Sequence, residues 1–378
     1  MQIFTEKWTE LHNEIHVSSL EEGCTKDGFI ANDLLMPKLY APKHYLSTNE
    51  YLKDQRFPTQ LNNCKKKLNG EIYLKYGYFV MNNVHFSDRY FFLKKNKYQD
   101  YNFIISHANN ERSLAHFLPE AIVFKNLNDS EIIEETCFLC LPSRGHYLNY
   151  GAFLTQIVTQ IQEFRKINKF IKIAVNKMTE WQKNLLKYFF PDLTFIEIDV
   201  WPMAKSFYFK KIIIPFKKDA TVLSQNDIAF FKKKSIYKNS NRKIFLSRLS
   251  QKQTARKLTN EYQIINYLKN KNFKIIFPED ETPQQIAKIL GEAEYVFGVG
   301  GAGMFNCVFC KPNTKFLSIE GGRWAPVHSK MFSAINLDYS IVQSHPVLPI
   351  AEITNLAQCE SYVNMDEFIN FVEINYNL

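Results

Sequence analysis

Residues 294–322, EYVFGVGGAGMFNCVFCKPNTKFLSIEGG, decide the fold. The β-branched and aromatic run Tyr295 to Gly298 predicts a strand, and glycines follow it directly. The apolar segment Met304 to Cys310 predicts a helix, and Lys315 to Ile319 predicts a second strand. Strand, glycine turn, helix and strand in this order are typical of a parallel sheet covered by helices.

The same alternation precedes this stretch. We predict strands over Lys243 to Ser247 and Phe273 to Phe277, and helices over Leu258 to Asn270 and Pro283 to Leu290. Thr282 and Pro283 mark a helix start, because threonine caps free amides and proline supplies a helical φ at the first position. The second half is therefore predicted to be a run of βα units.

The first half shows the same patterns less regularly. An apolar stripe at three- and four-residue spacing predicts a helix over Tyr147 to Ile167. Lys217 to Lys243 is polar and basic, so we expect an irregular crossing between lobes there. The strands that we predict are Glu71 to Met81, Tyr101 to Ser106, Thr136 to Leu141, Phe170 to Val175, Leu193 to Ile198 and Phe207 to Phe216.

Length and composition fit two globular domains of the α/β class. A chain of 378 residues exceeds one ordinary core, and its 46% hydrophobic and 22% charged residues exclude a disordered protein. We predict an N-terminal lobe over residues 1–220, a C-terminal lobe over 221–345, and a helical segment over 346–378 that packs back on the first lobe.

The charge pattern limits the partners. The start lacks a basic and apolar leader and no long apolar run occurs, so we expect a soluble, cytoplasmic chain whose seven cysteines are reduced. The net charge of +9 is scattered, without a zinc-finger, RNP or basic-zipper pattern, which argues against nucleic-acid binding. Solvated surface, an anionic substrate, and peripheral contact with the cytoplasmic face of the inner membrane stay open.

The turn from Gly298 to Gly303 predicts a phosphate site. Glycines permit close backbone approach, and the free amides and positive dipole end of the following helix favour an anion. Glu320, at the end of the next strand, is placed to accept hydrogen bonds from ribose hydroxyls. The alternative is that the glycines only allow close packing of helix and strand.

The same glycines also match a dinucleotide fingerprint. Gly298, Gly300 and Gly303 fit G-x-G-x-x-G, with Glu320 about where its acidic residue belongs, so an NAD-dependent oxidoreductase is an alternative. That fold needs further βα units after the acidic strand. The 58 residues after Glu320, from 321 to 378, show no such alternation, so we favour a site for one nucleotide diphosphate.

Several motifs follow one another over residues 244–322. They are Ser247-Arg248 at a strand end, Arg256, Asn260-Glu261 heading a helix, Gln285, Gly301-Ala302-Gly303-Met304-Phe305-Asn306, Pro312 and Glu320. In order and spacing this segment resembles glycosyltransferase family 61. The family usually has His directly before Gly-Ala-Gly, where this chain has Gly300. For that reason a non-catalytic member that binds a glycan or a partner is a further alternative.

The resemblance implies two Rossmann-like lobes in the GT-B arrangement and an inverting glycosyltransferase. The second lobe then binds a nucleotide-sugar donor, and the first presents an oligosaccharide or polysaccharide acceptor. We expect a hexosyl- or pentosyltransferase of bacterial surface polysaccharide synthesis, capsular or lipopolysaccharide-type. No Asp-x-Asp motif occurs, so neither a metal nor another cofactor is expected.

The resemblance also implies the donor-binding residues. Arg248 and Arg256 offer guanidinium groups to the departing diphosphate, with surface salt bridges as the alternative. Asn306 is expected to hold the loop or touch phosphate, and Glu261 to cap its helix or reach the nucleotide. The full set is Ser247, Arg248, Arg256, Glu261, Gly301, Ala302, Gly303, Asn306 and Glu320.

In the first half, Leu114 to Glu120 resembles the family's His-x-x-x-acid element. Glu120 is our candidate for the base that takes the acceptor's proton, and His116 lies one helical turn away, as a second base or as the group that orients Glu120. A solvated glutamate and a core histidine are the alternatives. Arg144 and His146 precede the long helix and are acceptor-side candidates that suit an anionic glycan.

Two Cys-x-x-Cys pairs, Cys137/Cys140 and Cys307/Cys310, superficially suggest zinc. Their surroundings read as apolar strand and helix interiors rather than turns. Buried free thiols are therefore the favoured interpretation.

Overall fold

The chain divides into two compact units. The first unit comprises Met1–Leu34, Tyr73–Leu148 and Gln156–Ala220, and the second comprises Leu35–Ile72, Asn149–Thr155 and Thr221–Leu378. Residues 149–155, which the sequence interpretation left in the first lobe, thus belong to the second unit. The computed structural model describes residues 29–35, 40–46, 73–87, 90–93, 103–106, 130–141, 148–166, 168–199, 205–217, 223–238, 240–251, 256–321, 325–349, 352–353 and 359–378.

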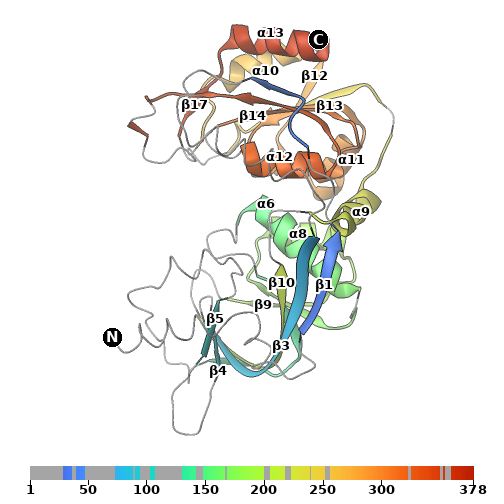
Figure 1. The fold of residues 1–378 in the computed structure, drawn as a ribbon, viewed down its shortest axis with the longest axis vertical. Coiled ribbons are helices and arrows are strands. Elements are labelled where there is room, and N and C mark those ends of the chain that lie inside the picture. The colour runs from blue at the N-terminus through green and yellow to red at the C-terminus, as the bar shows by residue number, and fades with distance from the viewer. Residues whose placement is uncertain are drawn as a thin grey trace. The chain divides into compact units, whose positions relative to one another are not determined.

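The first unit contains a mixed sheet. Its strands are β1 (Phe29–Leu35), β3 (Tyr73–Ser87), β4 (Tyr90–Leu93), β5 (Phe103–Ser106), β6 (Glu131–Ile133), β7 (Cys137–Leu139), β8 (Lys172–Asn176), β9 (Phe195–Ile198) and β10 (Ser206–Lys217). The order is β5-β4-β3-β10-β7-β8-β9, with β1 beside β3 and β6 beside β10 (Figure 1). β10, β7, β8 and β9 are parallel, whereas β3 joins β10 antiparallel. All six strands that were predicted in this half are present.

The long helix predicted over Tyr147 to Ile167 is confirmed as three consecutive segments. They are α6 (Tyr150–Ala152), the π-helical η3 (Phe153–Val158) and α7 (Thr159–Arg165). Phe164 of α7 stacks on Phe138 of β7 with ring centroids 4.0 Å apart, so the apolar stripe faces the sheet. A further helix, α8 (Glu180–Phe189), forms the crossover between the parallel strands β8 and β9.

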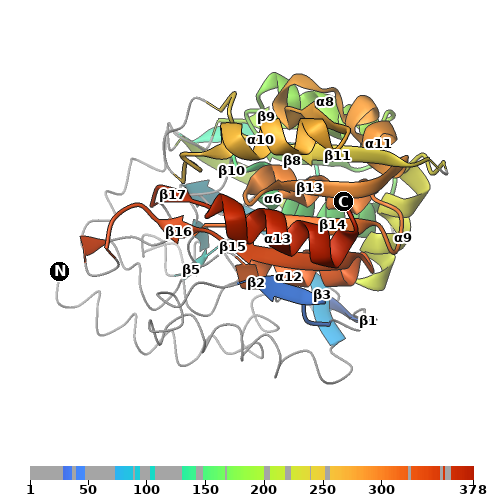
Figure 2. The same cartoon turned by 90° about the horizontal axis from the view of Figure 1, so that it is seen from above.

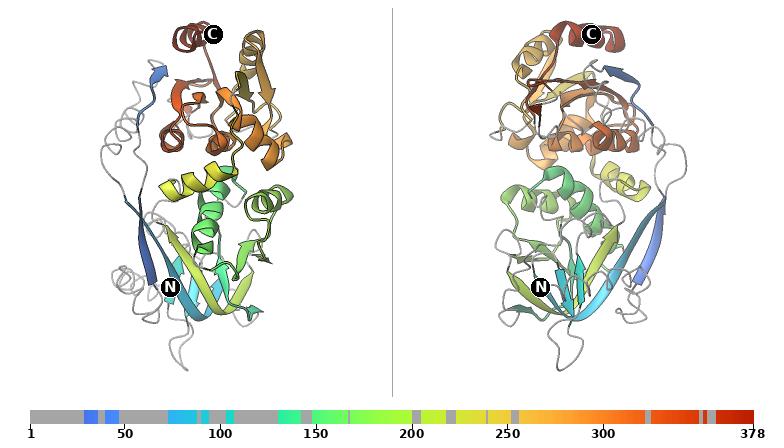
Figure 3. Two further views of the ribbon diagram at one scale, coloured as in Figure 1. Left: turned by 90° about the vertical axis from the view of Figure 1, so that its right-hand side faces the viewer. Right: turned by 60° about the vertical axis from the view of Figure 1, so that its left-hand side comes forward.

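The second unit contains a parallel sheet. Its strands are β2 (His44–Leu46), β11 (Arg242–Leu246), β12 (Phe273–Ile276), β13 (Ala293–Val299), β14 (Lys315–Glu320) and β15 (Asp338–Gln343). The order is β12-β11-β13-β14-β15-β2, and every pair is parallel. The edge strand β2, blue in Figure 3, comes from the N-terminal part of the chain. From β11 onward this is the 2-1-3-4-5 order of a doubly wound sheet, which confirms the α/β class.

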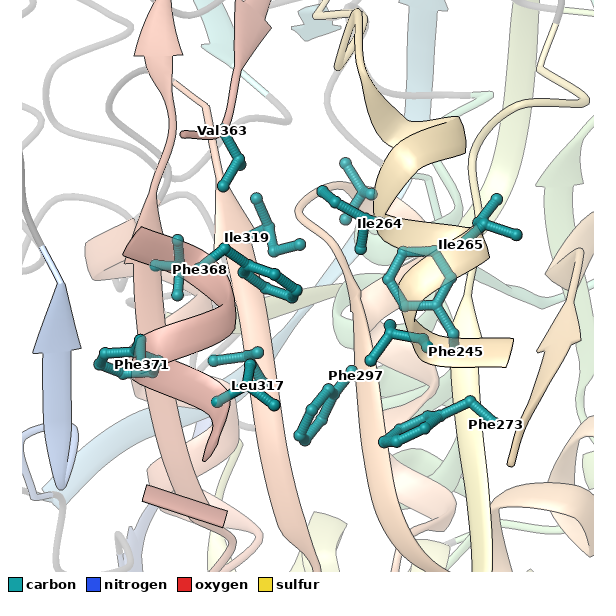
Figure 4. Packing of buried hydrophobic residues seen from close by; sticks show 14 of the residues in the cluster. Phe245, Ile264, Ile265, Phe273, Phe297, Leu317, Ile319, Val363, Phe368 and Phe371 are labelled. Atoms are coloured by element: carbon teal, nitrogen blue, oxygen red, sulfur yellow. The ribbon is translucent and has the colours of Figure 1, made fainter. Parts of the chain in front are cut away.

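Helices cover both faces of this sheet (Figures 1 and 2). One face carries α10 (Glu261–Asn270) and α13 (Met365–Tyr376), and the other carries α11 (Pro283–Gly291), the 3-10 helix η5 (Ala302–Phe309) and α12 (Ala325–Ala334). Under α10 and α13, the buried side chains of Phe245, Phe297 and Leu317 form a continuous core with those of the two helices (Figure 4). The alternation that the sequence predicted for the second half is therefore present.

The C-terminal helix packs on the second unit, and the expectation that it returns to the first lobe is wrong. Phe368 and Phe371 of α13 belong to the core cluster of the second sheet. Tyr376 donates a hydrogen bond of 3.1 Å to the carbonyl of Phe316 in β14. The physical reason is that α10 leaves part of this sheet face uncovered. The ring contact of Phe368 with Tyr267 of α10, 6.1 Å between centroids, places the two helices side by side.

Two hydrogen bonds between the Asn260 side chain and the backbone of Val363 fix the segment before α13. Strands β16 (His345–Pro346) and β17 (Ser361–Tyr362) form a small antiparallel pair. The Asn260 amide donates to the carbonyl of Val363 at 2.7 Å and accepts from the amide of Val363 at 3.0 Å. Residue 260, directly before α10, therefore anchors the chain that leads into α13.

Two sequence interpretations are wrong, because helices form in two segments whose sequences show no clear helical period. The range Lys217 to Lys243 was expected to be irregular but contains α9 (Gln225–Lys234). Ser224 starts this helix, because its hydroxyl accepts from the amide of Asp227 while the Asp227 carboxylate accepts from the amide of Ser224. After Glu320 the chain forms α12 and β15, so the argument that no βα unit follows the acidic strand is wrong.

Candidate functional site

The candidate site lies where the strand order of the second sheet reverses. β11 leads to β12 on one side, while β13 starts the run β13-β14-β15 on the other. In open α/β sheets, ligands bind outside the carboxyl ends of the strands at such a switch point. Ser247 and Arg248 follow β11, and the glycine turn follows β13. The topology therefore places two of the predicted motifs at the position where a ligand is expected.

The glycine turn is held by two backbone hydrogen bonds. The amide of Gly300 donates to the carbonyl of Ile319 at 2.7 Å, and the amide of Met304 donates to that of Gly301 at 3.0 Å. Gly301 has φ 157° and ψ −172°, a conformation that is nearly restricted to glycine. The predicted helix that follows is present as η5, which is a 3-10 helix, and its first amides have no acceptor within the helix.

Two of the glycines lie against charged side chains. A Cβ at Gly300 would lie 2.4 Å from Oε2 of Glu320, and one at Gly301 would lie 3.0 Å from Nη1 of Arg248. At Gly303 the nearest atom would be 3.5 Å away, on Pro278, which is an ordinary contact. Gly300 and Gly301 therefore let two charged side chains approach the turn, whereas Gly298, where a Cβ would lie 2.6 Å from Sδ of Met304 in η5, allows the close packing of helix and strand that the alternative describes.

Arg248 joins the two strand ends. Its Nη1 donates to the carbonyl of Gly300 at 2.8 Å, and its Nε donates to Oε1 of Gln251 at 3.0 Å. The pKa of Arg248 is lowered, first by burial and then by the positive charge of Arg256. Burial also lowers the pKa of Arg256, which adopts φ 65°. Two half-buried guanidinium groups that repel each other form an environment that favours an anion.

Ser247 and Glu261 shape the loop after β11. One oxygen of the buried Glu261 carboxylate accepts from the Ser247 hydroxyl at 2.6 Å and from the amide of Arg248 at 2.8 Å. Burial raises the pKa of Glu261, and these two hydrogen bonds oppose that rise. The sequence interpretation considered helix capping and nucleotide contact as roles of Glu261. The geometry assigns it a different role, which is to hold the loop that carries Arg248.

Asn306 holds the glycine turn in shape, as one of its two interpretations proposed. Its amide donates to the carbonyl of Gly303 at 2.9 Å, and its carbonyl oxygen accepts from the hydroxyl of Tyr150 at 2.5 Å. Phe305 packs against the backbone of Gly151, where a Cβ would lie 2.7 Å from the ring. The start of α6 therefore packs against η5, a contact that the sequence interpretation did not foresee.

Glu320 does not present its carboxylate outward for a ribose, because it is 0% exposed. Its Oε1 lies 2.7 Å from Nδ1 of His328 in α12 and accepts from the Ser318 hydroxyl. Burial alone would raise the pKa of Glu320, but His328, Ser318 and Arg248 together hold it below its ordinary value. His328 was missed by the sequence interpretation. The available signal was a histidine eight positions after Glu320 within a segment of helical length.

The remaining site candidates are not placed. Glu120, His116, Arg144 and His146 lie outside the described residues, so the first-half site stays an expectation. The four cysteines of the two Cys-x-x-Cys pairs are buried free thiols, as expected, and burial raises their pKa values. Within the described ranges, no three His, Cys, Asp or Glu side chains are grouped so that they could hold a metal ion.

Fold and site together define a doubly wound α/β protein with an arginine held against a glycine turn at the switch point of its sheet. The chain belongs to the family described as Glycosyltransferase 61, whose profile matches residues 29–317. It is therefore a glycosyltransferase, and the oxidoreductase alternative is not retained. No curated protein matches the sequence. Among the helices of the described residues, none has the length and apolar character that a membrane span requires.

Proposed function

We propose that the second unit binds a nucleotide-sugar donor, with the diphosphate at the turn from Gly300 to Gly303 and beside Arg248 and Arg256. The observation that carries this proposal is the hydrogen bond from Arg248 to the carbonyl of Gly300 at the switch point. It brings a guanidinium group and the first amides of η5 to one place. Both kinds of donor match phosphate oxygens.

Electrostatics support the same assignment. Arg248 and Arg256 are both half-buried, and burial is the main reason that the pKa of each guanidinium group is lowered. A diphosphate supplies the negative charge that compensates this cost, and the arginines neutralise the charge that develops as the diphosphate leaves. In this proposal the guanidinium groups and amides do what a metal ion does in other transferases, and no metal or other cofactor takes part.

Transfer requires a base on the acceptor side. In the proposed GT-B arrangement the first lobe presents the acceptor hydroxyl, Glu120 takes its proton, and His116 is the secondary candidate or orients Glu120. The deprotonated oxygen then attacks the anomeric carbon from the side opposite the diphosphate, which inverts the configuration. Arg144 and His146 would bind an anionic glycan.

The biological setting is part of the proposal. We infer that the product is a bacterial surface polysaccharide of capsular or lipopolysaccharide type, and that the transferred sugar is a hexose or a pentose. The net charge of +9 supports work at the cytoplasmic face of the inner membrane, because basic surface is attracted to anionic lipid and to anionic glycan.

Ligand-induced stabilisation tests the donor site. Thermal unfolding is followed with UDP, GDP, CDP, ADP, their sugar conjugates and NAD, since a ligand that binds only the folded state raises its stability. We expect at least one nucleoside diphosphate to stabilise the chain, and Arg248→Ala to abolish that shift. Lys274→Ala, an exposed position on β12, is the matched control. Stabilisation by NAD alone would overturn the proposal.

The acceptor side has its own test. In Glu120→Ala, we expect sugar transfer to fall by about 10²-fold or more while the nucleotide-induced shift is retained. Full transfer activity in this variant would refute Glu120 as the base. Nucleotide binding without transfer to any glycan in the unchanged protein would instead support the non-catalytic alternative.

A further inference from the structure

Residues 232–242, KKKSIYKNSNR, form a basic segment that the proposed donor site does not use. The range contains four lysines, one arginine and no acidic residue. It begins in the last turn of α9, where the C-terminal end of the helix dipole favours positive charge, and it ends at the first residue of β11. The whole segment belongs to the second unit.

The basic segment lies at the amino edge of the second sheet. Arg242 is the first residue of β11, and Lys311, which lies between η5 and β14, donates a hydrogen bond of 3.1 Å from Nζ to the carbonyl of Lys238. Arg248 and the glycine turn instead follow the carboxyl ends of β11 and β13. Because these two strands are parallel, the basic segment and the proposed donor site lie at opposite edges of the sheet.

Contacts with the end of α11 hold the backbone of the basic segment in place. The amide of Lys238 donates to the carbonyl of Gly291 at 3.4 Å, and the Ser240 hydroxyl donates to the carbonyl of Glu292 at 2.6 Å. A Cβ at Gly291 would collide with the carbonyl of Ile236, so the two backbones are in direct contact. The segment is therefore a fixed part of the surface.

Two large apolar side chains are exposed between the lysines of this segment. Ile236 is 39% exposed and Tyr237 is 38% exposed. The side chains of Lys232, Lys233 and Lys238 on either side of them are exposed too. None of these three lysines forms an ion pair with a carboxylate of the residues that the structure describes. The segment thus presents uncompensated positive charge together with apolar surface.

This combination matches the surface of an anionic bilayer. Lysines are attracted to lipid phosphates, while aliphatic and aromatic side chains enter the boundary between headgroups and acyl chains. We propose that the basic segment docks the enzyme on an anionic lipid surface, with Ile236 and Tyr237 inserted and the lysines on the headgroups. A soluble polyanion would bind the lysines but leave the two apolar side chains in water. The inference rests on the proposed function only for its membrane setting, and donor binding is independent of it.

Sedimentation of the full chain with lipid vesicles tests the inference. The vesicles consist of phosphatidylcholine alone or with about one third phosphatidylglycerol, at an ionic strength of about 0.15 M. We expect the unchanged protein to bind the anionic vesicles and not the neutral ones. Lys232→Gln/Lys233→Gln/Lys238→Gln should bind about 100-fold more weakly, because each lysine near an anionic surface contributes about fivefold. Absence of binding to anionic vesicles by the unchanged protein would overturn the inference.

Exposed lysines outside the segment supply the matched control. Lys177→Gln/Lys187→Gln/Lys269→Gln removes the same net charge and should keep vesicle binding within about threefold, because distant charges are screened. Ile236→Ser/Tyr237→Ser keeps every charge and should bind anionic vesicles about tenfold more weakly. Dextran sulfate, a soluble polyanion, should bind this double variant as well as it binds the unchanged protein.

Three results would contradict the docking surface. Equal losses in the triple variant and its control would show attraction by net charge alone. Binding of dextran sulfate without binding of anionic vesicles would indicate a soluble polyanion as the partner. Unchanged vesicle binding in Ile236→Ser/Tyr237→Ser would exclude insertion. If that variant does not fold, as judged by thermal unfolding, the exposed lysines and their control decide.

The donor site is tested separately in the same variants. Nucleoside diphosphates should stabilise Lys232→Gln/Lys233→Gln/Lys238→Gln as much as they stabilise the unchanged protein, because the segment lies at the other edge of the sheet. Absence of stabilisation in both proteins would overturn the donor site and leave the vesicle result standing. Loss of vesicle binding with stabilisation retained is the result that we expect.

Discussion

Arg248 donates a 2.8 Å hydrogen bond to the backbone carbonyl of Gly300, although the two residues are 52 positions apart. The bond joins the carboxyl ends of β11 and β13, the two strands between which the sheet order reverses. A guanidinium group of a loop is thereby held against a glycine turn. This contact turns two separate sequence motifs into one site.

Gly300→Ala is expected to destabilise the second unit. The new methyl group would lie 2.4 Å from Oε2 of Glu320, so the buried carboxylate or the turn has to shift. We expect a loss of about 1–3 kcal/mol in the free energy of unfolding, measured in urea. Gly303→Ala is the matched control, because its nearest neighbour is 3.5 Å away on Pro278. Equal losses at both positions would contradict the clash with Glu320.

Tyr150→Phe is expected to loosen the glycine turn. The change removes the hydroxyl that donates to Asn306 at 2.5 Å and leaves the Asn306 oxygen without this donor. We expect a cost of about 1 kcal/mol and faster amide exchange in residues 302–309. Tyr262→Phe, at a position that is 55% exposed, should change neither quantity. Unchanged exchange in η5 would show that α6 does not support the turn.

Phe368→Ala tests the packing of α13 on the second unit. Phe368 is 0% exposed and contacts the ring of Tyr267 in α10. Deleting a buried phenyl ring should cost about 3–5 kcal/mol in the free energy of unfolding. Ile374→Ala, on the same helix but 67% exposed, should cost less than about 0.5 kcal/mol. A small effect of Phe368→Ala would indicate that α13 does not cover this core.

The lowered pKa of Glu320 predicts acid destabilisation with a definite sign. Its pKa lies below the ordinary 4.5 in the folded state, so below that pH the unfolded chain takes up a proton that the folded chain does not. The stability that Glu320 contributes is therefore complete above the unfolded value and is lost as pH falls through the folded one. The slope from this residue is at most about 1.4 kcal/mol per pH unit.

Urea unfolding between about pH 5.5 and pH 3 measures this effect, because that range brackets an ordinary glutamate. We expect a flatter profile in the double variant Glu320→Gln/His328→Gln than in the unchanged protein. Glu281→Gln, a loop carboxylate that follows the short turn after β12, is the control and should keep the original slope. Glu261 acts in the opposite direction, because its pKa is raised, but it is common to all three proteins.

Local patterns were sufficient for most elements and for part of the site. Thr282 and Pro283 mark the start of α11, and the glycines after Tyr295 to Gly298 mark the end of β13, because caps and turns are written in neighbouring residues. Ser247, Arg248 and Asn306 were recognised, and all three contact the loop or turn to which they were assigned. The apolar period did not predict α9, because this helix buries only a short face and its other residues are polar or basic.

Other features depend on contacts between residues that are distant in the chain. The sequence by itself determined the strands and helices of the second unit from β11 to β14 and the glycine turn between β13 and η5, because each depends on a few adjacent side chains. Only the tertiary structure decided that His328 meets Glu320, that Tyr150 supports Asn306 and that α13 covers the second sheet. Those contacts form because apolar and polar surfaces that the sheet leaves uncovered must be buried by other segments. The pattern of neighbouring residues does not indicate which segment will cover which surface.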